Sequence, residues 1–261
     1  MLGFEKQDLR LAVNLLKMTV KDRYLGSSLG SFWAIANPLF MLALYTFVFG
    51  YVFKVRLPGA ETTLGYVVWL ISGYGPWIAT VEAITASTAS VVGAAGIVKN
   101  MAFKTELLPI SSAFIGLISL AVSLVFLLIL LFASGNPPSW HVVLLPIIVG
   151  LQFFLIVAIG MWLAALNVFA RDLSLALPNL LTIIMFATPI FYPLASMPQV
   201  VQKISIANPF YIIVDAYRGI MLQHILPNLW GLLYVFMLSG FLFWAGLRAF
   251  RRAKGYFDAA L

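Results

Sequence analysis

The chain of 261 residues has no cysteine and only two histidines. Without cysteine there is no disulfide, no thiolate metal site and no cysteine nucleophile. His141 and His224 stand far apart, in no spacing that would assemble a metal site or pair a nucleophile with its base. We therefore expect neither a metal ion nor catalytic residues in this chain.

Charged residues are also scarce, at 10%, whereas 62% of the residues are hydrophobic. A soluble domain has about 25% charged residues, so most of this chain is expected to lie in lipid. The net charge of +7 comes from short Lys and Arg clusters between apolar runs, which form no continuous basic face for nucleic acid. The phosphate-binding pattern G-x-x-x-x-G-K-[ST] is absent too, so we expect no cofactor here and any ATP-driven work must depend on another subunit.

Six apolar runs are long enough for transmembrane helices, because a bilayer core about 30 Å thick takes about 20 helical residues. They cover residues 31–53, 64–95, 107–133, 142–170, 173–191 and 229–250. Six spans place both termini on one side. With that side cytoplasmic, only Lys54, Arg56, Lys203 and Arg218 of the 16 Lys and Arg residues lie outside, as the positive-inside rule favours. We predict an all-α polytopic membrane protein forming a single transmembrane domain over 1–261.

The apolar stretch 192–228 before the last run does not fit a seventh span, which would move the C-terminal basic cluster outside. Pro198 suits the first turn of one short helix, and Asn208 followed by Pro209 suits the start of another. We predict a re-entrant or interfacial helix pair on the outer side. Irregular backbone at that depth must be covered by protein or line a water-filled cavity, so the pair should border a pathway.

The first segment, 1–30, is predicted to contain an amphipathic helix lying at the cytoplasmic headgroups. Its apolar stripe is flanked by amines; the stripe is Leu9, Val13, Leu16 and Val20, and the amines are Lys6, Arg10, Lys17 and Lys21. Two roles stay open at this point, a plain membrane anchor and a mechanical contact with a partner.

The inner loop 97–109 mixes apolar and charged side chains, which suits docking into a cleft on a soluble partner. Its candidate contact residues are Lys99, Asn100, Met101, Phe103 and Lys104. The alternative is a simple connector between two spans.

Three groups of residues within or beside the spans are candidates for the pathway. Glu82 is the one carboxylate inside a predicted span, and its distance from the start of that span places it near the inner boundary, in a structural role or a gating one. Tyr45, Phe49 and Phe53 follow one another at helical spacing, as channel lining for sugar rings or as ordinary lipid-facing aromatics. Tyr211, Asp215 and Arg218 form one polar helical face, which either meets hydroxyl-rich cargo or holds a buried ion pair.

Three ordered segments resemble the permeases of polysaccharide-exporting ABC transporters. The first, from Arg23-Tyr24 through Gly26-Ser27 and Gly30 to Trp33, followed by Asn37-Pro38, resembles the pattern RY-x-G-S-x-L-G-x-x-W…NP. The second joins Asn167 and Arg171-Asp172 to the run Thr188 to Pro193, with Thr188 where the family usually has Ser. The third runs from Asn208-Pro209 to Ala216-Tyr217-Arg218.

The resemblance implies a homodimer that pairs with two copies of an ATPase subunit holding ATP and Mg²⁺, and that exports a lipid-linked polysaccharide such as an O-antigen, capsule or teichoic acid across the cytoplasmic (inner) membrane. By this similarity, Lys99 to Lys104 would couple to the ATPase. Tyr192, Tyr211, Asp215, Tyr217 and Arg218 would shape the exit gate. Arg23, Tyr24, Gly26, Ser27 and Gly30 would form a hinge whose guanidinium could also meet a lipid diphosphate.

Three rival functions remain at this point. An exporter of small lipophilic molecules could use the same fold. A membrane-embedded transferase would need convergent acid, base or metal groups that nine carboxylates and two histidines do not obviously supply. An interaction scaffold without transport would make the polar face around Asp215 dispensable.

Overall fold

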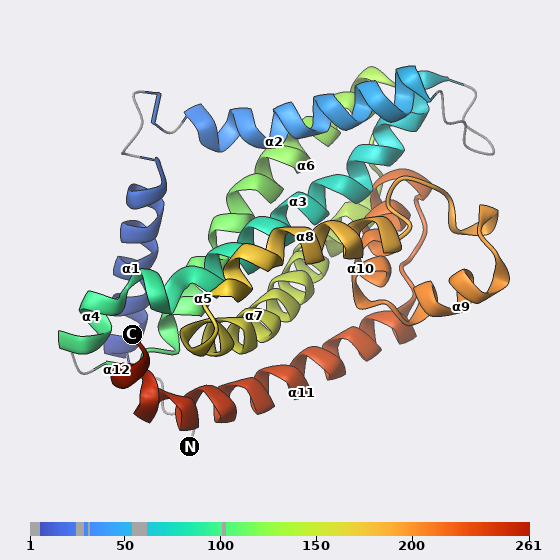
Figure 1. Ribbon diagram of the computed structural model, residues 1–261. Coiled ribbons are helices and arrows are strands. Elements are labelled where there is room, and N and C mark those ends of the chain that lie inside the picture. The colour runs from blue at the N-terminus through green and yellow to red at the C-terminus, as the bar shows by residue number, and fades with distance from the viewer. Residues whose placement is uncertain (1–5, 25–28, 31, 54–61, 101–102) are drawn as a thin grey trace.

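The computed structural model describes residues 6–24, 29–30, 32–53, 62–100 and 103–261 (Figure 1). This part of the chain consists of helices and their connections, with no strand. Five of its helical segments are long and apolar enough to cross a membrane. They are Phe32–Val52, Thr63–Gly93, Leu107–Ala133, Trp140–Phe169 and Leu229–Tyr256. The predicted all-α, multi-pass membrane architecture is confirmed.

The long segments contain shorter elements. The first is α2 (Phe32–Tyr45) continued by the π-helical η1 (Thr46–Val52), and the second is α3 (Thr63–Gly93). The third is α5 (Leu107–Ala113) and α6 (Ile115–Ala133), and the fourth is η2 (Trp140–Leu144) and α7 (Leu145–Phe169). The last is α11 (Leu229–Ala253) with the short turn η5 (Lys254–Tyr256).

The predicted fifth span, 173–191, overran its helix. Helix α8 (Asp172–Ala187) has 16 residues, about 24 Å at 1.5 Å per residue, and is shorter than the other five. The chain leaves the helix at Thr188, whose backbone is extended (φ −95°, ψ 133°), because the following Pro189 disfavours helical geometry at that position. Apolar composition continues through Phe191, which is why the sequence pattern alone did not show this end.

Helix α3 is the centre of the molecule. It packs against α6, α7, α5 and α10. Protein buries 83% of its apolar 18-residue stretch, far more than in the other long helices. Small residues permit this packing: a Cβ on Gly116 of α6 would lie 2.3 Å from the Ala79 carbonyl oxygen, and one on Gly160 of α7 would lie 2.7 Å from the Ser87 Cβ. The helix backbones therefore approach as closely as the small-residue interfaces of membrane helices allow.

One end of the molecule, the α1 end, carries α1 (Lys6–Tyr24), α4 (Ala95–Asn100) and α12 (Phe257–Ala260), and α1 lies across the direction of α2 (Figure 1). Leu15 is buried in a cluster with residues of α5, α7 and α11, so α1 has a protein-facing side that the predicted Val13 and Leu16 stripe did not include. Lys104 pairs with Asp8 of α1, and Arg251 pairs with the buried Glu106. The loop after α4 is thus tied to both α1 and α11.

The opposite end, the α10 end, carries the predicted helix pair: η3 (Leu194–Ser196), α9 (Gln199–Ala207) and α10 (Pro209–Arg218), followed by the π-helical η4 (Gly219–Gln223) (Figure 1). Asn208 caps α10, since its side chain accepts a hydrogen bond from the Phe210 backbone N–H, and Pro209 occupies the first turn. The prediction of two short helices is confirmed, with 9 residues in α9 and 10 in α10.

Candidate functional site

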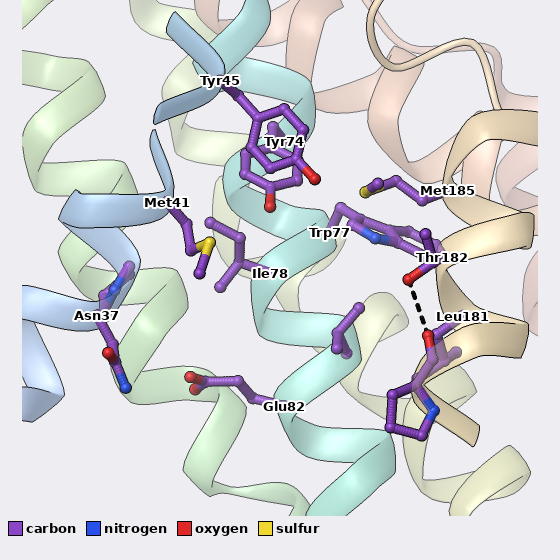
Figure 2. Close-up of a pocket in the computed structure, with 13 residues that line it drawn as sticks. Asn37, Met41, Tyr45, Tyr74, Trp77, Ile78, Glu82, Leu181, Thr182 and Met185 are labelled. Carbon is purple, nitrogen blue, oxygen red and sulfur yellow. Dashed lines mark hydrogen bonds between the residues drawn. The ribbon is translucent and has the colours of Figure 1, made fainter. Parts of the chain in front are cut away.

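A cavity of about 320 Å³ lies between α2, α3 and α8 (Figure 2). Helix α2 contributes Asn37, Pro38, Met41 and Tyr45, helix α3 contributes Tyr74, Trp77, Ile78, Val81 and Glu82, and helix α8 contributes Pro178, Leu181, Thr182 and Met185. Its wall is mostly apolar, with a few polar groups. This is the composition of a ligand site that binds through shape and a small number of hydrogen bonds.

One end of this cavity is charged. The Arg23 guanidinium at the end of α1 lies 3.3 Å from a Glu82 carboxylate oxygen, and the Ser119 hydroxyl of α6 donates a hydrogen bond to the same carboxylate. Figure 2 shows Glu82 near Asn37 and Met41, away from the tyrosines. Arg23 and Glu82, for which the sequence predicted separate roles, form one ion pair that joins α1 to the cavity wall.

The other end of the cavity is aromatic. The Tyr45 ring lies 4.5 Å from that of Tyr74 and 5.0 Å from that of Phe191, and the Phe49 ring stacks on Phe191 at 4.7 Å. Phe191, which the sequence placed at the end of a span and in the second resembling segment but without a role, is 2% exposed and is the centre of this cluster. Phe53 lies further along, with 66% of its surface exposed, and lines no part of the cavity.

Arg218 of the predicted exit gate points into the protein and is 4% exposed. Its guanidinium donates to the carbonyls of Pro189 (2.9 Å) and Ile190 (2.7 Å), and it lies 3.6 Å from the centre of the Trp69 ring. The second and third resembling segments therefore meet at this residue. A planar guanidinium suits the site because it donates in two directions while its face stacks on an indole.

Two further hydrogen bonds hold the same junction. The Asn208 amide donates to the Thr188 hydroxyl at 2.9 Å, and the Tyr66 hydroxyl of α3 donates to the Phe191 carbonyl at 3.1 Å. Thr188, where the resembling family usually has Ser, keeps the hydroxyl that this contact requires. The backbone carbonyls left without helical partners after Ala187 are in this way satisfied by side chains.

The other predicted gate residues lie in different places, Tyr217, Tyr211 and Asp215 on α10 and Tyr192 between α8 and η3. Tyr217 is fully buried and donates to Gln152 of α7 at 2.7 Å, and Gln152 in turn donates to the Pro76 carbonyl of α3 at 2.8 Å. Tyr192 donates to the Phe186 carbonyl at 2.6 Å. Tyr211 and Asp215 line a separate cavity beside α11. Tyr211, Asp215 and Arg218 interact electrostatically, as a shared polar face predicts, but the described contacts contain no direct ion pair between Asp215 and Arg218, because the guanidinium is held by the Pro189 and Ile190 carbonyls.

The start of the predicted coupling loop, residues 97–100, lies in the short helix α4 (Ala95–Asn100), in which no residue is buried. Lys99 and Asn100 are exposed, and the Asn100 amide donates to the Gly96 carbonyl. Two later residues of the loop are bound to the rest of the protein. Lys104 forms an ion pair with Asp8, and the Phe103 carbonyl accepts a 2.6 Å hydrogen bond from Lys254. Met101 lies outside the described residues.

Part of the predicted hinge also lies outside the described residues, namely Gly26, Ser27 and the side chain of Tyr24. Gly30 has φ of 49°, the left-handed conformation that glycine adopts without strain, and α2 begins two residues later. Gly30 therefore supplies a turn conformation directly before the start of α2.

Asn167 of the second resembling segment links three helices. Its amide donates to the Thr88 carbonyl of α3 at 3.1 Å, and its carbonyl oxygen accepts from the Ser174 backbone N–H of α8. Sequence reasoning gave this residue no role. Within the described part of the chain, no group of three His, Cys, Asp or Glu residues could hold a metal ion.

Comparison with known proteins identifies the family. Residues 11–222 match the family described as ABC-2 type transporter. The chain belongs to this family. It is 30% identical over 253 residues to an O-antigen export system permease protein RfbA of Myxococcus xanthus, covering 96% of this chain and 95% of that one. Two proteins of the same description from Klebsiella pneumoniae are each 27% identical, over 82% and 96% of this chain and 80% and 95% of theirs.

Because the chain belongs to the ABC-2 family, the cavity and the helix pair are parts of a transporter component. The match covers the segment from α1 to η4 and so includes the ion pair, the aromatic cluster and the Arg218 junction. Membership and the long apolar helices together make this chain the membrane part of a transporter.

Proposed function

We propose that this chain is a channel-forming permease that exports a lipid-linked polysaccharide of the O-antigen type across the cytoplasmic membrane. The proposal rests on one observation above all, the similarity over almost full length to proteins named as O-antigen export permeases. As in the family implied by the sequence motifs, the active unit would be a homodimer bound to two ATPase subunits. Both termini and α4 would face the cytoplasm.

The cavity between α2, α3 and α8 supports a glycan pathway. Its aromatic end offers the flat faces of Tyr45 and Tyr74, on which the apolar faces of sugar rings can slide. Few side chains at this end could form strong hydrogen bonds with sugar hydroxyl groups. Weak contacts suit a polymer that has to pass through the cavity. A polymer passing between α2 and α8 would have to leave past the junction made by Arg218.

The α1 end supports coupling to an ATPase. Helix α4 is exposed and basic at Lys99, while Lys104 ties the following loop to Asp8 of α1. Helix α1 in turn reaches the cavity through Arg23 and Glu82. A displacement of α4 by a partner would therefore reach the inner end of the cavity through two ion pairs, and ATP binding would shift the population of open and closed states through such differential contacts.

Deletion of the gene in its host tests the proposal. We expect loss of the surface polysaccharide and accumulation of the lipid-linked glycan on the cytoplasmic side, with recovery when the gene is restored. Normal surface polysaccharide in the deletion strain would contradict the proposal. A defect confined to resistance against small lipophilic compounds would instead support the rival cargo.

A further inference from the structure

A second cavity, of about 480 Å³, lies between α9, α10 and the start of α11 at the α10 end (Figure 1). It shares no lining residue with the cavity between α2, α3 and α8. Helix α10 separates the two, because Phe210 packs against Trp77 on one side, with ring centroids 5.4 Å apart, while Tyr211 and Asp215 line the cavity on the other. We call this second space the outer cavity.

The outer cavity is lined by hydrogen-bonding groups set among apolar walls. Its polar side chains are Tyr211 and Asp215 of α10, Asn228 before α11, and Trp230 and Tyr234 of α11. The Tyr211 hydroxyl and the Asp215 carboxylate hydrogen-bond to each other, and the Tyr234 hydroxyl is fixed on the Ala207 carbonyl at 3.2 Å. The cavity volume falls in the range of about 300–1,000 Å³ found for small-molecule sites.

Trp230 is the most exposed large apolar side chain of α11, at 81%. Its backbone N–H is held by the Asn228 side chain that caps the helix, so the position of the residue is fixed although its ring is open. An indole offers an apolar face together with an N–H donor. The Trp230 ring is therefore an exposed aromatic surface at the rim of the outer cavity, and its backbone is held in place by the helix cap.

The charges of the outer cavity decide between ligand classes. Its described lining contains no Lys, Arg or His. The Arg218 guanidinium, which interacts electrostatically with Asp215, is hydrogen-bonded to the Pro189 and Ile190 carbonyls and does not line the cavity. A lipid phosphate or diphosphate would meet Asp215 with no cation beside it in the lining, which opposes binding. A sugar has an apolar C–H face and uncharged hydroxyl groups, which match an indole face, a carboxylate, an amide and phenols.

We propose that the outer cavity binds a sugar residue of an uncharged glycan, with the ring stacked on Trp230 and its hydroxyl groups hydrogen-bonded to Asp215 and Asn228. The proposal rests on the proposed function and adds to it a saccharide site outside the pathway cavity. A sugar bound there bridges α10 and α11. It therefore contacts the emerging polymer on the far side of α10 from the pathway cavity.

The test uses the full-length chain in lipid nanodiscs and the host's own surface polysaccharide, freed of lipid by mild acid and cut to short oligosaccharides. Binding is titrated by saturation-transfer NMR. We expect saturable binding that W230A and D215N each weaken at least about tenfold, which is 1.4 kcal/mol. D215N keeps the shape of the side chain and removes its charge, so it tests the carboxylate without leaving a void in the lining.

Trp244→Ala is the matched control, because Trp244 lies on the same helix, is half exposed and lines neither cavity. It should bind as the wild type does. Three results would overturn the site: unchanged affinity in W230A and D215N, absence of saturable binding to the wild type, or displacement of the oligosaccharide by glycerophosphoethanolamine. The last would assign the cavity to a lipid headgroup. All three leave the proposed function standing if the deletion strain has lost its surface polysaccharide.

Discussion

The ion pair between Arg23 and Glu82 is the residue-scale contact with the clearest functional consequence. Arg23 is 34% exposed, so the pair contributes at most about 1 kcal/mol to stability, and its importance must lie in where it holds α1. We expect Arg23→Glu and Glu82→Arg each to reduce surface polysaccharide, because each places like charges together. The double variant R23E/E82R should restore part of the export, measured as surface glycan per cell.

The double variant also separates the two roles open for Arg23. If the guanidinium met a lipid diphosphate instead of latching α1 to α3, a glutamate at position 23 would block export whatever stood at position 82. If R23E/E82R exports no better than the single variants, the Arg23–Glu82 ion pair is not what export requires of Arg23.

Arg218 gives a second prediction at this scale. One ammonium cannot donate to the Pro189 and Ile190 carbonyls and also stack on Trp69, so we expect Arg218→Lys to cost about 1.5–3 kcal/mol. The melting temperature in detergent should fall. Arg248→Lys is the control, since Arg248 lies 3.7 Å from the Trp244 ring but is exposed, and its loss should change stability by less than about 0.5 kcal/mol. Equal effects of the two variants would contradict the prediction.

Residues such as Arg218 mark where sequence reasoning ended. Its helical spacing with Tyr211 and Asp215 predicted a shared polar face, but the partners of its guanidinium were not foreseeable because they lie far along the chain, at Trp69 and Pro189. The pairing of Glu82 with Arg23 was missed for the same reason. The residue pattern within one helix predicts which side chains share a face, whereas the tertiary packing decides which side chains and carbonyls each of them contacts.

At the scale of elements, long apolar runs bounded by polar or turn residues predicted most helix ends to within a few residues. The third run, 107–133, matches the span formed by α5 and α6. The predicted end of the fifth span, at residue 191, was wrong because the apolar composition continues past Pro189 although α8 ends at Ala187. The α9 and α10 pair was predictable because Pro209 and the Asn208 cap are local signals, and their effect does not depend on distant contacts.

The crossing of α3 and α6 is the element contact most sensitive to size. A Cβ at position 116 would lie 2.3 Å from a backbone oxygen of α3, so the helices must move apart in Gly116→Ala. We expect a loss of about 1–3 kcal/mol of stability, seen as a lower melting temperature in detergent. Gly150→Ala in α7 meets nothing within 4 Å and should be neutral or stabilising by up to about 1 kcal/mol. A tolerated G116A would contradict close backbone packing of α3 on α6.

For the whole molecule, the α1 end carries most of the basic residues and the α10 end carries the predicted gate residues, an asymmetry from which we expect the α1 end to face the cytoplasm. The absence of native cysteine makes this directly measurable, since any introduced cysteine is the single thiol. Lys99→Cys on the exposed α4 reports on the α1 end, and Ile225→Cys, at a position 53% exposed, reports on the α10 end.

A membrane-impermeant maleimide should label I225C in intact spheroplasts and K99C only after the membrane is opened. Phe236→Cys, at an apolar position 55% exposed within α11, is the control for burial in the bilayer and should stay unlabelled in both conditions. The opposite pattern at positions 99 and 225 would place α4 outside. Since an ATPase that drives export must hydrolyse cytoplasmic ATP, that result would also exclude α4 as its docking helix. Labelling as expected leaves α4, α1 and the Arg23–Glu82 pair on the side where a partner's motion can open the cavity.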